Sequence, residues 1–285
     1  MPPLQLSVLS LLALLAFSGN SLLGRLALKE TPIDPASFTS IRLLSGAIVL
    51  WILVSCFNKT HSEKNQKNGS WVSALALFSY AAAFSFAYVS LDAGIGALIL
   101  FGAVQATMIS FGLWHGEKLS LIQWIGFSSA IGGLILLLFP GVSTPSIAHS
   151  ILMITAGISW GIYSIRGKNT LNPTTATERN FLLTLPLTLL LSLVTIKKIN
   201  VEITGVIYAA LSGGLTSAIG YSIWYKVLPH LRSTTAATMQ LSAPVITSIA
   251  GILFLNELFT WQLVLASIVI LGGIGLVIFG KTKGI

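Results

Sequence analysis

Three amide side chains lie inside long apolar stretches of this sequence, at Asn20, Gln105 and Gln240. An amide surrounded by hydrocarbon must find a hydrogen-bond partner on another helix or face a water-filled cavity. The residues alone leave both interpretations open: a link between helices, or the lining of a cavity. In the second interpretation the amides offer hydrogen bonds to a bound solute.

Aromatic side chains occur at helical spacing within the same stretches. Trp160 and Tyr163 are three residues apart, as are Tyr221 and Trp224, and Tyr80 lies inside another stretch. Residues three apart share one face of a helix, so each pair can form part of a wall. Such walls suit an apolar or aromatic metabolite that a few polar groups orient. The alternative is that these rings lie at the membrane interface, where Trp and Tyr gather.

Charged residues lie mainly where one apolar stretch ends and another begins. We predict that Glu117 and Glu257 cap the helix that follows each of them, because a carboxylate accepts from free N–H groups there. Arg42 is predicted to lie at a junction too, with an interface position, a carboxylate partner or substrate contact as alternatives. None of the eight acidic residues is clearly in the middle of a stretch, which argues against a proton-exchanging multidrug carrier.

Several classes of protein are disfavoured by the pattern. His, Asp and Glu show no metal-ligand spacing, the H-E-x-x-H motif is missing, and no Ser/His pair stands out. We therefore expect no metal, no cofactor and no catalytic residue. The net charge of +8 does not indicate a nucleic-acid partner, because basic residues lie at the ends of apolar stretches and form no long run.

The elements that must position these residues are membrane-spanning helices. Only 8% of the residues are charged, whereas soluble domains carry about a quarter. Apolar stretches of about 20 residues recur, the length that crosses a bilayer core. Ten spans are predicted: Leu4–Leu23, Ser37–Cys56, Trp71–Val89, Gly94–Trp114, Leu119–Phe139, Ile147–Ser164, Phe181–Ile196, Ile203–Val227, Ser233–Leu255 and Trp261–Phe279. The fold class is an all-α membrane protein, multi-pass in the cell inner membrane.

An internal repeat divides the chain. Placing both termini in the cytoplasm puts most of the 16 basic residues on the cytoplasmic side. Features recur at an offset of 140 residues, namely Glu117 and Glu257, Ser120 and Thr260, and the pairs Gly132-Gly133 and Gly272-Gly273. Two halves, 1–142 and 143–285, each hold five spans, so the second is inverted relative to the first. Inverted repeats are typical of secondary transporters. Pro186 and Pro244 are candidate hinges.

The sequence resembles the EamA-type carriers of the drug/metabolite transporter superfamily. The resemblance rests on Arg42, the run Gly116–Ser120, Gly132-Gly133, Ala243-Pro244, Asn256-Glu257 and Gly272-Gly273. It implies ten helices and a central cavity lined by the first, third and fourth helices of each half, with the fifth helices at the periphery. In the first half the fourth helix departs from the family, with Val104-Gln105 where a proline is common.

The leading hypothesis is export of a small metabolite, with an amino acid as first candidate, by alternating access. A sugar-phosphate or nucleotide-sugar antiporter is the alternative, but it needs cations facing the cavity, and only Lys226 and Arg232 are near. A membrane-embedded enzyme or scaffold would leave the repeat unexplained. The expected partners are a small-molecule substrate and the lipid bilayer. The protein is expected as a monomer or a homodimer, since the Gly157–Gly161 motif permits close helix approach.

Overall fold

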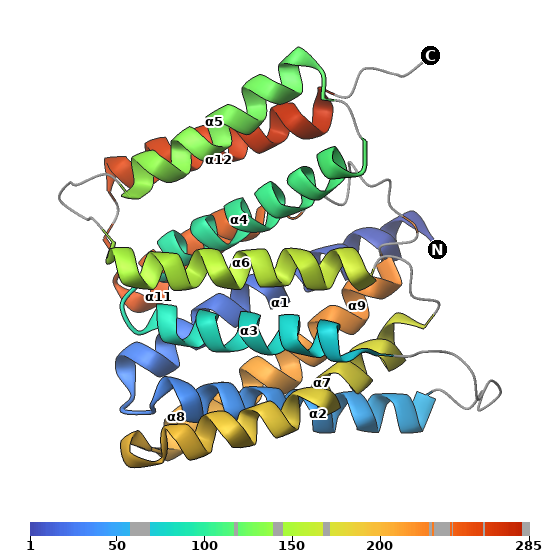
Figure 1. Ribbon diagram of the computed structural model, residues 1–285, viewed down its shortest axis with the longest axis vertical. Helices are drawn as coiled ribbons and strands as arrows, with labels where there is room; N and C mark the ends of the chain where they lie inside the picture. The colour runs from blue at the N-terminus through green and yellow to red at the C-terminus, as the bar shows by residue number, and fades with distance from the viewer. Residues whose placement is uncertain are drawn as a thin grey trace.

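The computed structural model describes residues 1–57, 69–116, 119–138, 145–167, 172–227, 230, 240, 242–258 and 260–280. Within these ranges all regular elements are helical (Figure 1). They are α1 (Pro3–Glu30), α2 (Pro35–Phe57), α3 (Trp71–Tyr88), α4 (Ala93–Trp114), α5 (Leu121–Leu138), α6 (Ile147–Gly167), α7 (Pro173–Val194), η1 (Ile196–Lys198), α8 (Ile203–Leu211), η2 (Ser212–Ile219), α9 (Gly220–Val227), α11 (Ser242–Leu255) and α12 (Trp261–Phe279). The predicted all-α class holds for the described residues.

Most of these helices have the length and hydropathy of membrane spans. Six described segments could cross a membrane: Pro3–Glu30, Pro35–Cys56, Trp71–Tyr88, Ala93–Trp114, Ile147–Gly167 and Ile203–Trp224. Three further apolar helices are shorter in their described parts: Leu121–Leu136, Ser242–Leu255 and Trp261–Val277. These segments correspond to every predicted span except the seventh, which is α7. The protein is therefore a multi-pass membrane protein.

Two predicted boundaries are wrong. The first span was expected to end at Leu23, but α1 continues to Glu30 and carries Arg25 within it. The seventh was expected to begin at Phe181, but α7 begins at Pro173 and includes Arg179. In both cases a polar segment at the helix end was read as a loop. Most of the first part of the predicted ninth span, residues 233–239 and 241, lies outside the described residues.

The segment from α8 to α9 is continuous but changes its winding in the middle. Between the α-helical ends, η2 is a π-helix over Ser212–Ile219. Gly213 lies in this stretch, and a Cβ there would collide with the backbone carbonyl of Arg42 and the side chain of Ser45. The lack of a side chain at Gly213 therefore lets η2 approach α2 at backbone distance. A π-helical turn inside a helix often marks a functional site.

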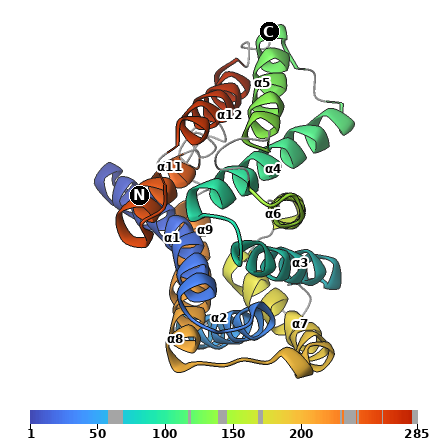
Figure 2. The same ribbon diagram turned by 90° about the vertical axis from the view of Figure 1, so that its left-hand side faces the viewer.

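Helices α5 and α12 form an antiparallel pair at one edge of the bundle (Figures 1 and 2). Near the start of α5, the Gln123 side chain donates to the Val277 carbonyl at 2.9 Å, near the end of α12. Their middles meet at glycines, because a Cβ on Gly126 would lie 2.5 Å from the Gly273 carbonyl oxygen. The fifth helix of one predicted half thus runs opposite to the fifth helix of the other.

Helices α2 and α7, the second of each predicted half, are likewise antiparallel. Ser40, early in α2, lies with its hydroxyl 3.1 Å from that of Ser192, late in α7. Six residues further along α2, Gly46 approaches the ring of Phe181, which is early in α7. This pair lies at the end of the molecule away from α5 and α12 (Figure 2). At each of these two opposite edges of the bundle, one helix from each predicted half therefore packs against its counterpart.

The GxxxG motif of α6 is used inside the bundle. A Cβ at Gly157 would lie 2.6 Å from Ala103 Cβ, and one at Gly161 would lie 2.9 Å from Thr107. Both neighbours belong to α4, so the small residues bring α4 and α6 together. This packing accounts for the motif without a second copy of the chain.

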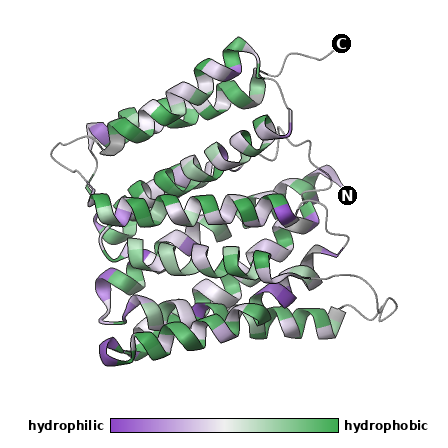
Figure 3. Ribbon diagram, viewed as in Figure 1, coloured by the Kyte–Doolittle hydropathy of each residue, from purple (hydrophilic) through white to green (hydrophobic). Residues whose placement is uncertain are grey.

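The distribution of side chains suits a lipid environment. Large hydrophobic residues are exposed on the outside, among them Trp51, Leu253 and Trp261. Hydrophobic residues run along the helices, and hydrophilic residues gather near several helix ends (Figure 3). Polar residues such as Asn20 and Arg42 are buried instead. The start of α1 and the end of α12 lie on the same side of the bundle (Figure 1).

Candidate functional site

Arg42 lies in the interior of the bundle, not at a junction. It is the eighth residue of α2 and is 1% exposed. Helix α2 begins at Pro35, and the Asp34 side chain caps it by accepting hydrogen bonds from the N–H groups of Ala36 and Ser37. The prediction that Arg42 is a junction residue is therefore wrong. Helix α2 begins about two turns before Arg42, so Arg42 lies inside the bundle and not at the helix start.

The guanidinium of Arg42 is held by hydroxyls and aromatic rings. Its Nη2 donates to the Tyr80 hydroxyl at 3.0 Å and to the Ser217 hydroxyl at 3.4 Å. The guanidinium carbon lies 4.7 Å from the ring centre of Phe84. Nη1 is buried and has no hydrogen-bond partner among the described residues. A buried cation with no counter-ion is costly, and within a membrane protein it usually serves a function.

Asn20 connects three helical segments next to Arg42. Its amide nitrogen donates to the Tyr80 hydroxyl of α3 at 3.1 Å. Its amide oxygen accepts from Ser212 at 2.7 Å and from Thr216 at 3.4 Å, both in η2. The predicted amide thus has the inter-helix partners that hydrocarbon demands. Its partner Tyr80 is also the partner of Arg42, so one network joins α1, α2, α3 and η2.

Trp160 of α6 lies between two tyrosines from different helices. Its ring centre is 4.9 Å from that of Tyr80 in α3 and 4.8 Å from that of Tyr221 in α9. Tyr163, its predicted partner on the same face, is 5.5 Å away. We call Asn20, Arg42, Tyr80, Trp160, Ser217 and Tyr221 the central cluster. It brings together residues from both predicted halves.

The second predicted aromatic pair is Tyr221, which belongs to the central cluster, and Trp224, which lies beside it. Phe17 of α1 contacts Tyr221 and Trp224, with ring centres 6.1 Å and 5.7 Å apart. Tyr163 is buried, and its hydroxyl accepts a long hydrogen bond of 3.5 Å from Asn180. Of the predicted interior aromatic residues, Tyr80, Tyr163, Tyr221 and Trp224 are buried and Trp160 is partly buried, whereas tryptophans near helix ends such as Trp51 are exposed.

The remaining predicted residues lie apart from this network. Gln105 is buried in α4, but the hydrogen bonds described for the central cluster do not include it. Gln240 is partly buried, just before α11, and both its sequence neighbours are outside the described residues. Pro186 lies inside α7, and Pro244 is the third residue of α11 as described. The hinge roles of the two prolines and the cavity roles of the two amides stay predictions.

A second polar cluster lies where α1 ends. Arg25 donates to the backbone carbonyls of Tyr88 and Val89 at 3.0 and 3.1 Å, and to the Asp92 carboxylate at 3.1 Å. Its Nε is 3.7 Å from the carboxylate of Glu257. We call Arg25, Asp92 and Glu257 the Arg25 cluster. It joins α1, the turn between α3 and α4, and the connection between α11 and α12.

Glu257 does act as a cap, but not for the helix that follows it. Its carboxylate accepts from the backbone N–H of Ala93, the first residue of α4, at 2.7 Å. The following helix α12 is capped by Thr260, whose hydroxyl accepts from the N–H of Leu263 at 3.2 Å. The prediction that Glu257 caps α12 is therefore wrong, because Glu257 caps α4. Ser120 caps α5 in the same way as Thr260, and Glu117 lies outside the described residues.

The backbone before Glu257 explains why its side chain reaches another helix. Asn256 has a positive φ of 52°, and the N–H of Glu257 bonds to the Gly251 carbonyl at 3.2 Å. This is the left-handed helix ending in which Gly or Asn is favoured. Gly116, which precedes Asn256 by 140 positions, also has a positive φ, of 85°. The repeat in the sequence is thus a repeat of the backbone turn as well.

Burial raises the pKa of the Glu257 carboxyl above its ordinary value of 4.5, and the nearby Asp92 carboxylate raises it further. The hydrogen bonds from the backbone N–H groups of Ala93 and Gly94 and the charge of Arg25 act in the opposite direction. Since the net pKa shift is upward, the loss of hydration and the Asp92 charge together outweigh these three contacts.

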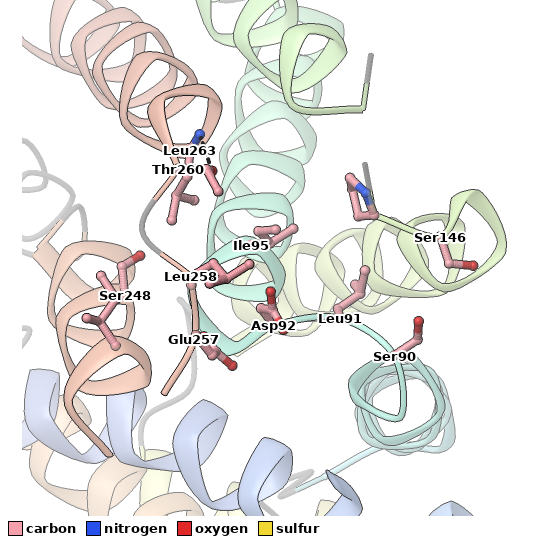
Figure 4. A pocket seen from close by; sticks show the side chains of 13 residues that line it. Ser90, Leu91, Asp92, Ile95, Ser146, Ser248, Glu257, Leu258, Thr260 and Leu263 are labelled. Atoms are coloured by element: carbon pink, nitrogen blue, oxygen red, sulfur yellow. Dashed lines mark hydrogen bonds between the residues drawn. The ribbon is translucent and has the colours of Figure 1, made fainter. Parts of the chain in front are cut away.

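A cavity of about 240 Å³ opens beside the Arg25 cluster (Figure 4). Its polar lining includes Ser90, Asp92, Ser146, Ser248, Glu257 and Thr260. None of the residues of the central cluster lines it. The rings of the central cluster pack against one another at tilted angles, and this cavity lies apart from them, near the end of α1.

Sequence reasoning missed several of these residues. Arg25 and Asp92 were assigned to connections between helices, and the hydroxyls of Ser212 and Ser217 were not considered. A usable signal existed in η2, because Ser212, Thr216 and Ser217 recur at helical spacing in an otherwise apolar stretch. Arg25 also follows Ser21 by one helical turn, which could have extended the first helix.

Comparison with known proteins identifies the sequence pattern. The EamA-like transporter family model matches residues 6–139 and again residues 148–279. An uncharacterized protein of Pseudomonas aeruginosa is 44% identical over 278 residues, which cover 98% of this chain and 96% of that protein. An uncharacterized transporter of Archaeoglobus fulgidus is 24% identical, covering 86% of this chain and 88% of the relative.

Two further comparisons agree with these. The uncharacterized transporter YoaV of Bacillus subtilis is 22% identical, over 85% of this chain and 86% of its own length. A crystal structure superimposes with a TM-score of 0.65 at 15% identity, covering 99% of this chain and 100% of the other. The likeness to that structure supports the fold alone.

Proposed function

This chain belongs to the EamA-like transporter family, and from that membership we propose that it carries a small metabolite across the inner membrane by alternating access. Membership in this family indicates a membrane transporter rather than an enzyme. The further proposal concerns the mechanism and the solute. We propose ten spans in two inverted repeats, residues 1–142 and 143–285, with both termini in the cytoplasm.

Antiparallel packing of equivalent helices supports the inversion. The second helices of the two halves, α2 and α7, run in opposite directions, and so do the fifth helices, α5 and α12. The turns at Gly116 and Asn256 both follow the fourth helix of a half. Two inverted halves can exchange conformations, which gives two states of similar energy that open to opposite sides.

The central cluster carries the proposal for the solute site. It lies between the halves, since Trp160 and Tyr221 come from the second half and Asn20, Arg42 and Tyr80 from the first. It combines aromatic walls with an amide, hydroxyls and one cation, the composition of a site for a small polar solute. An amino acid, our first candidate, has an apolar body for the rings and polar ends for the network. The direction we propose is export.

In one of its states a carrier is closed at its centre and open toward one side of the membrane. In the middle of the bundle Trp160 packs against Tyr80 and Tyr221 at tilted angles, and we propose that these rings close the passage there. The Arg25 cluster, with its cavity, lies at one end of the bundle. With both termini in the cytoplasm, this end faces the outside of the inner membrane.

Counterflow in proteoliposomes tests this proposal. The purified protein is reconstituted with an internal pool of one amino acid, and uptake of the same labelled amino acid is measured across a panel. We expect uptake for at least one member, and its loss in Trp160→Ala and Tyr221→Ala. The matched control is Trp51→Ala, because Trp51 is 57% exposed on the lipid side of α2. Uptake that survives both cluster substitutions would place the solute elsewhere.

The phosphate antiporter remains the alternative function because Arg42 is a buried cation near the proposed path. Of the cations named for that alternative, Lys226 is exposed at the end of α9, and Arg232 lies outside the described residues. Adding sugar phosphates and nucleotide sugars to the counterflow panel separates the two functions. Uptake of phosphate compounds alone would favour the antiporter.

A further inference from the structure

We propose that Arg42 binds the carboxylate of the transported solute, so that the substrate class is small carboxylic acids with an apolar or aromatic body. This inference rests on the proposed carrier function and narrows it. It assigns the recognition step to one residue and one functional group. It also predicts that an amino group on the solute is dispensable.

The first support is the missing counter-ion. The ion pairs among the described residues link Arg25 to Asp92, Arg25 to Glu257, and Lys29 to Glu30, and none of them includes Arg42. Arg42 is the more deeply buried of the two interior arginines, yet its neighbours are neutral. An uncompensated buried charge destabilises a fold strongly. A solute that supplies the negative charge would remove this cost in the loaded state.

The second support is the geometry of the guanidinium. A carboxylate binds an arginine through two parallel hydrogen bonds, one from each of two nitrogens. On Arg42, Nη1 has no partner in the described part of the chain, Nη2 donates to the hydroxyls of Tyr80 and Ser217, and the Tyr221 hydroxyl also interacts with the guanidinium. One donor is free, and the other has partners that a carboxylate can replace. Hydroxyls released in this way can donate to the carboxylate in turn.

The third support is the surroundings of the charge. The ring centres of Tyr80 and Phe84 lie 5.2 and 4.7 Å from the guanidinium carbon, and Trp160 packs against Tyr80 at a tilted angle. Charge-assisted hydrogen bonds are strongest where water is excluded, as it is here. The same rings offer an apolar contact surface for the rest of the solute.

No acidic residue belongs to the central cluster as described. The cluster therefore offers no carboxylate to an ammonium group, although Asn20 and the hydroxyls offer neutral acceptors. A site built for a zwitterion usually satisfies both charges, because each buried charge needs a partner. Recognition is thus expected to depend on the acid group far more than on the amine.

Arg179 provides a matched control. It occurs early in α7, the second helix of the second half, as Arg42 occurs early in α2. Arg179 is exposed, whereas Arg42 is buried. Replacing each by glutamine removes the same charge from equivalent helices, but only Arg42→Gln removes it from the central cluster.

Binding of four probes to the detergent-purified protein tests the proposal. The probes are 3-phenylpropionate, its neutral amide, L-phenylalanine and phenyl phosphate, and affinity is read from thermal shifts at increasing concentration. We expect both carboxylates to bind, and the amide to bind about 10- to 100-fold more weakly, as loss of a charge-assisted bond implies. Arg42→Gln is expected to abolish the preference for the acid, while Arg179→Gln retains it. Arg42→Lys, with a single-point charge, is expected to keep part of it.

The outcomes separate this inference from the carrier function. Equal binding of acid and amide to the unaltered protein, together with counterflow of either, would overturn the role of Arg42 and leave the carrier intact. Binding of phenyl phosphate alone would also overturn it. If no solute of the panel shows counterflow uptake, the proposed carrier function itself is contradicted. If Arg42→Gln does not fold, the comparison of acid and amide on the unaltered protein and on Arg42→Lys decides the matter.

Discussion

The carboxylate of Glu257 lies 2.7 Å from the backbone nitrogen of Ala93, although 164 positions separate the two residues. Glu257 follows the fourth helix of the second half, and Ala93 begins the fourth helix of the first half. One half therefore supplies the cap for the other. Arg25 completes this contact from α1, so the Arg25 cluster ties the two halves together at one end of the bundle.

Removing this cap is expected to destabilise the protein. Glu257→Ala leaves the Ala93 N–H and the Arg25 guanidinium without their acceptor, which costs about 1–3 kcal/mol. Glu257→Gln retains an oxygen for Ala93 and should cost less. Melting temperatures in detergent measure both changes. Glu30→Ala is the control, because the Glu30 side chain is 51% exposed and caps no helix N-terminus; an equal loss in that variant would contradict the capping role.

The pKa of Glu257 predicts a dependence of stability on pH. Because its pKa is higher in the folded protein than the ordinary 4.5, the folded state holds this proton more tightly than the unfolded state. The contribution to stability is therefore complete below pH 4.5 and is lost as the pH rises through the raised value. The difference in melting temperature between the unaltered protein and Glu257→Gln, followed from pH 4.5 upward, isolates this contribution. The charged groups that face Glu257 are Arg25 and Asp92. A difference that does not vary with pH would contradict the raised pKa.

The Tyr80 hydroxyl is expected to hold the central cluster together. Tyr80→Phe removes a group that accepts from both Arg42 and Asn20, so the Asn20 amide loses this partner and Arg42 Nη2 keeps only the longer bond to Ser217. The expected loss is about 1–3 kcal/mol in the free energy of unfolding. Tyr208→Phe, on a partly buried ring of α8, serves as the control. Equal melting temperatures for the two variants would show that the hydroxyl contributes nothing.

The glycines of α12 predict opposite effects for neighbouring positions. A Cβ at Gly273 would lie 2.6 Å from the Gly126 carbonyl oxygen, whereas one at Gly272 meets nothing within 4 Å. We expect Gly273→Ala to cost about 1–3 kcal/mol through overpacking. Gly272→Ala should be neutral or stabilise by up to about 1 kcal/mol, since alanine favours helix. Melting temperatures of the two variants form the comparison, and a destabilised Gly272→Ala would contradict the packing described.

Local patterns predicted the helices and some of the site. Apolar stretches of membrane length gave the spans, because length and hydropathy act over neighbouring residues. The spacing of Trp160 and Tyr163 correctly predicted that the two rings share a face. The repeat at an offset of 140 included the hydroxyls of Ser120 and Thr260, and although Glu117 and Glu257 were the predicted caps, these hydroxyls are the ones that cap α5 and α12. In each case the determining contacts lie within a few residues of each other.

The contacts that sequence reasoning could not give are remote ones. Arg42 was placed at a junction because a charge near a helix start usually reaches water. Its burial depends on Tyr80 and Ser217, which are 38 and 175 positions away. Glu257 was assigned to the next helix because a carboxylate before a helix usually accepts from its first N–H groups, and nothing near it in the sequence points to Ala93. Such pairings become visible only when the two halves are packed together.

The backbone contact between Gly126 and Gly273 constrains how such a chain can be divided into two separate fragments. Each half contributes one of the two helices, so either half made as a separate fragment leaves its glycine face uncovered. Two separately encoded fragments would have to meet in the bilayer before either was complete.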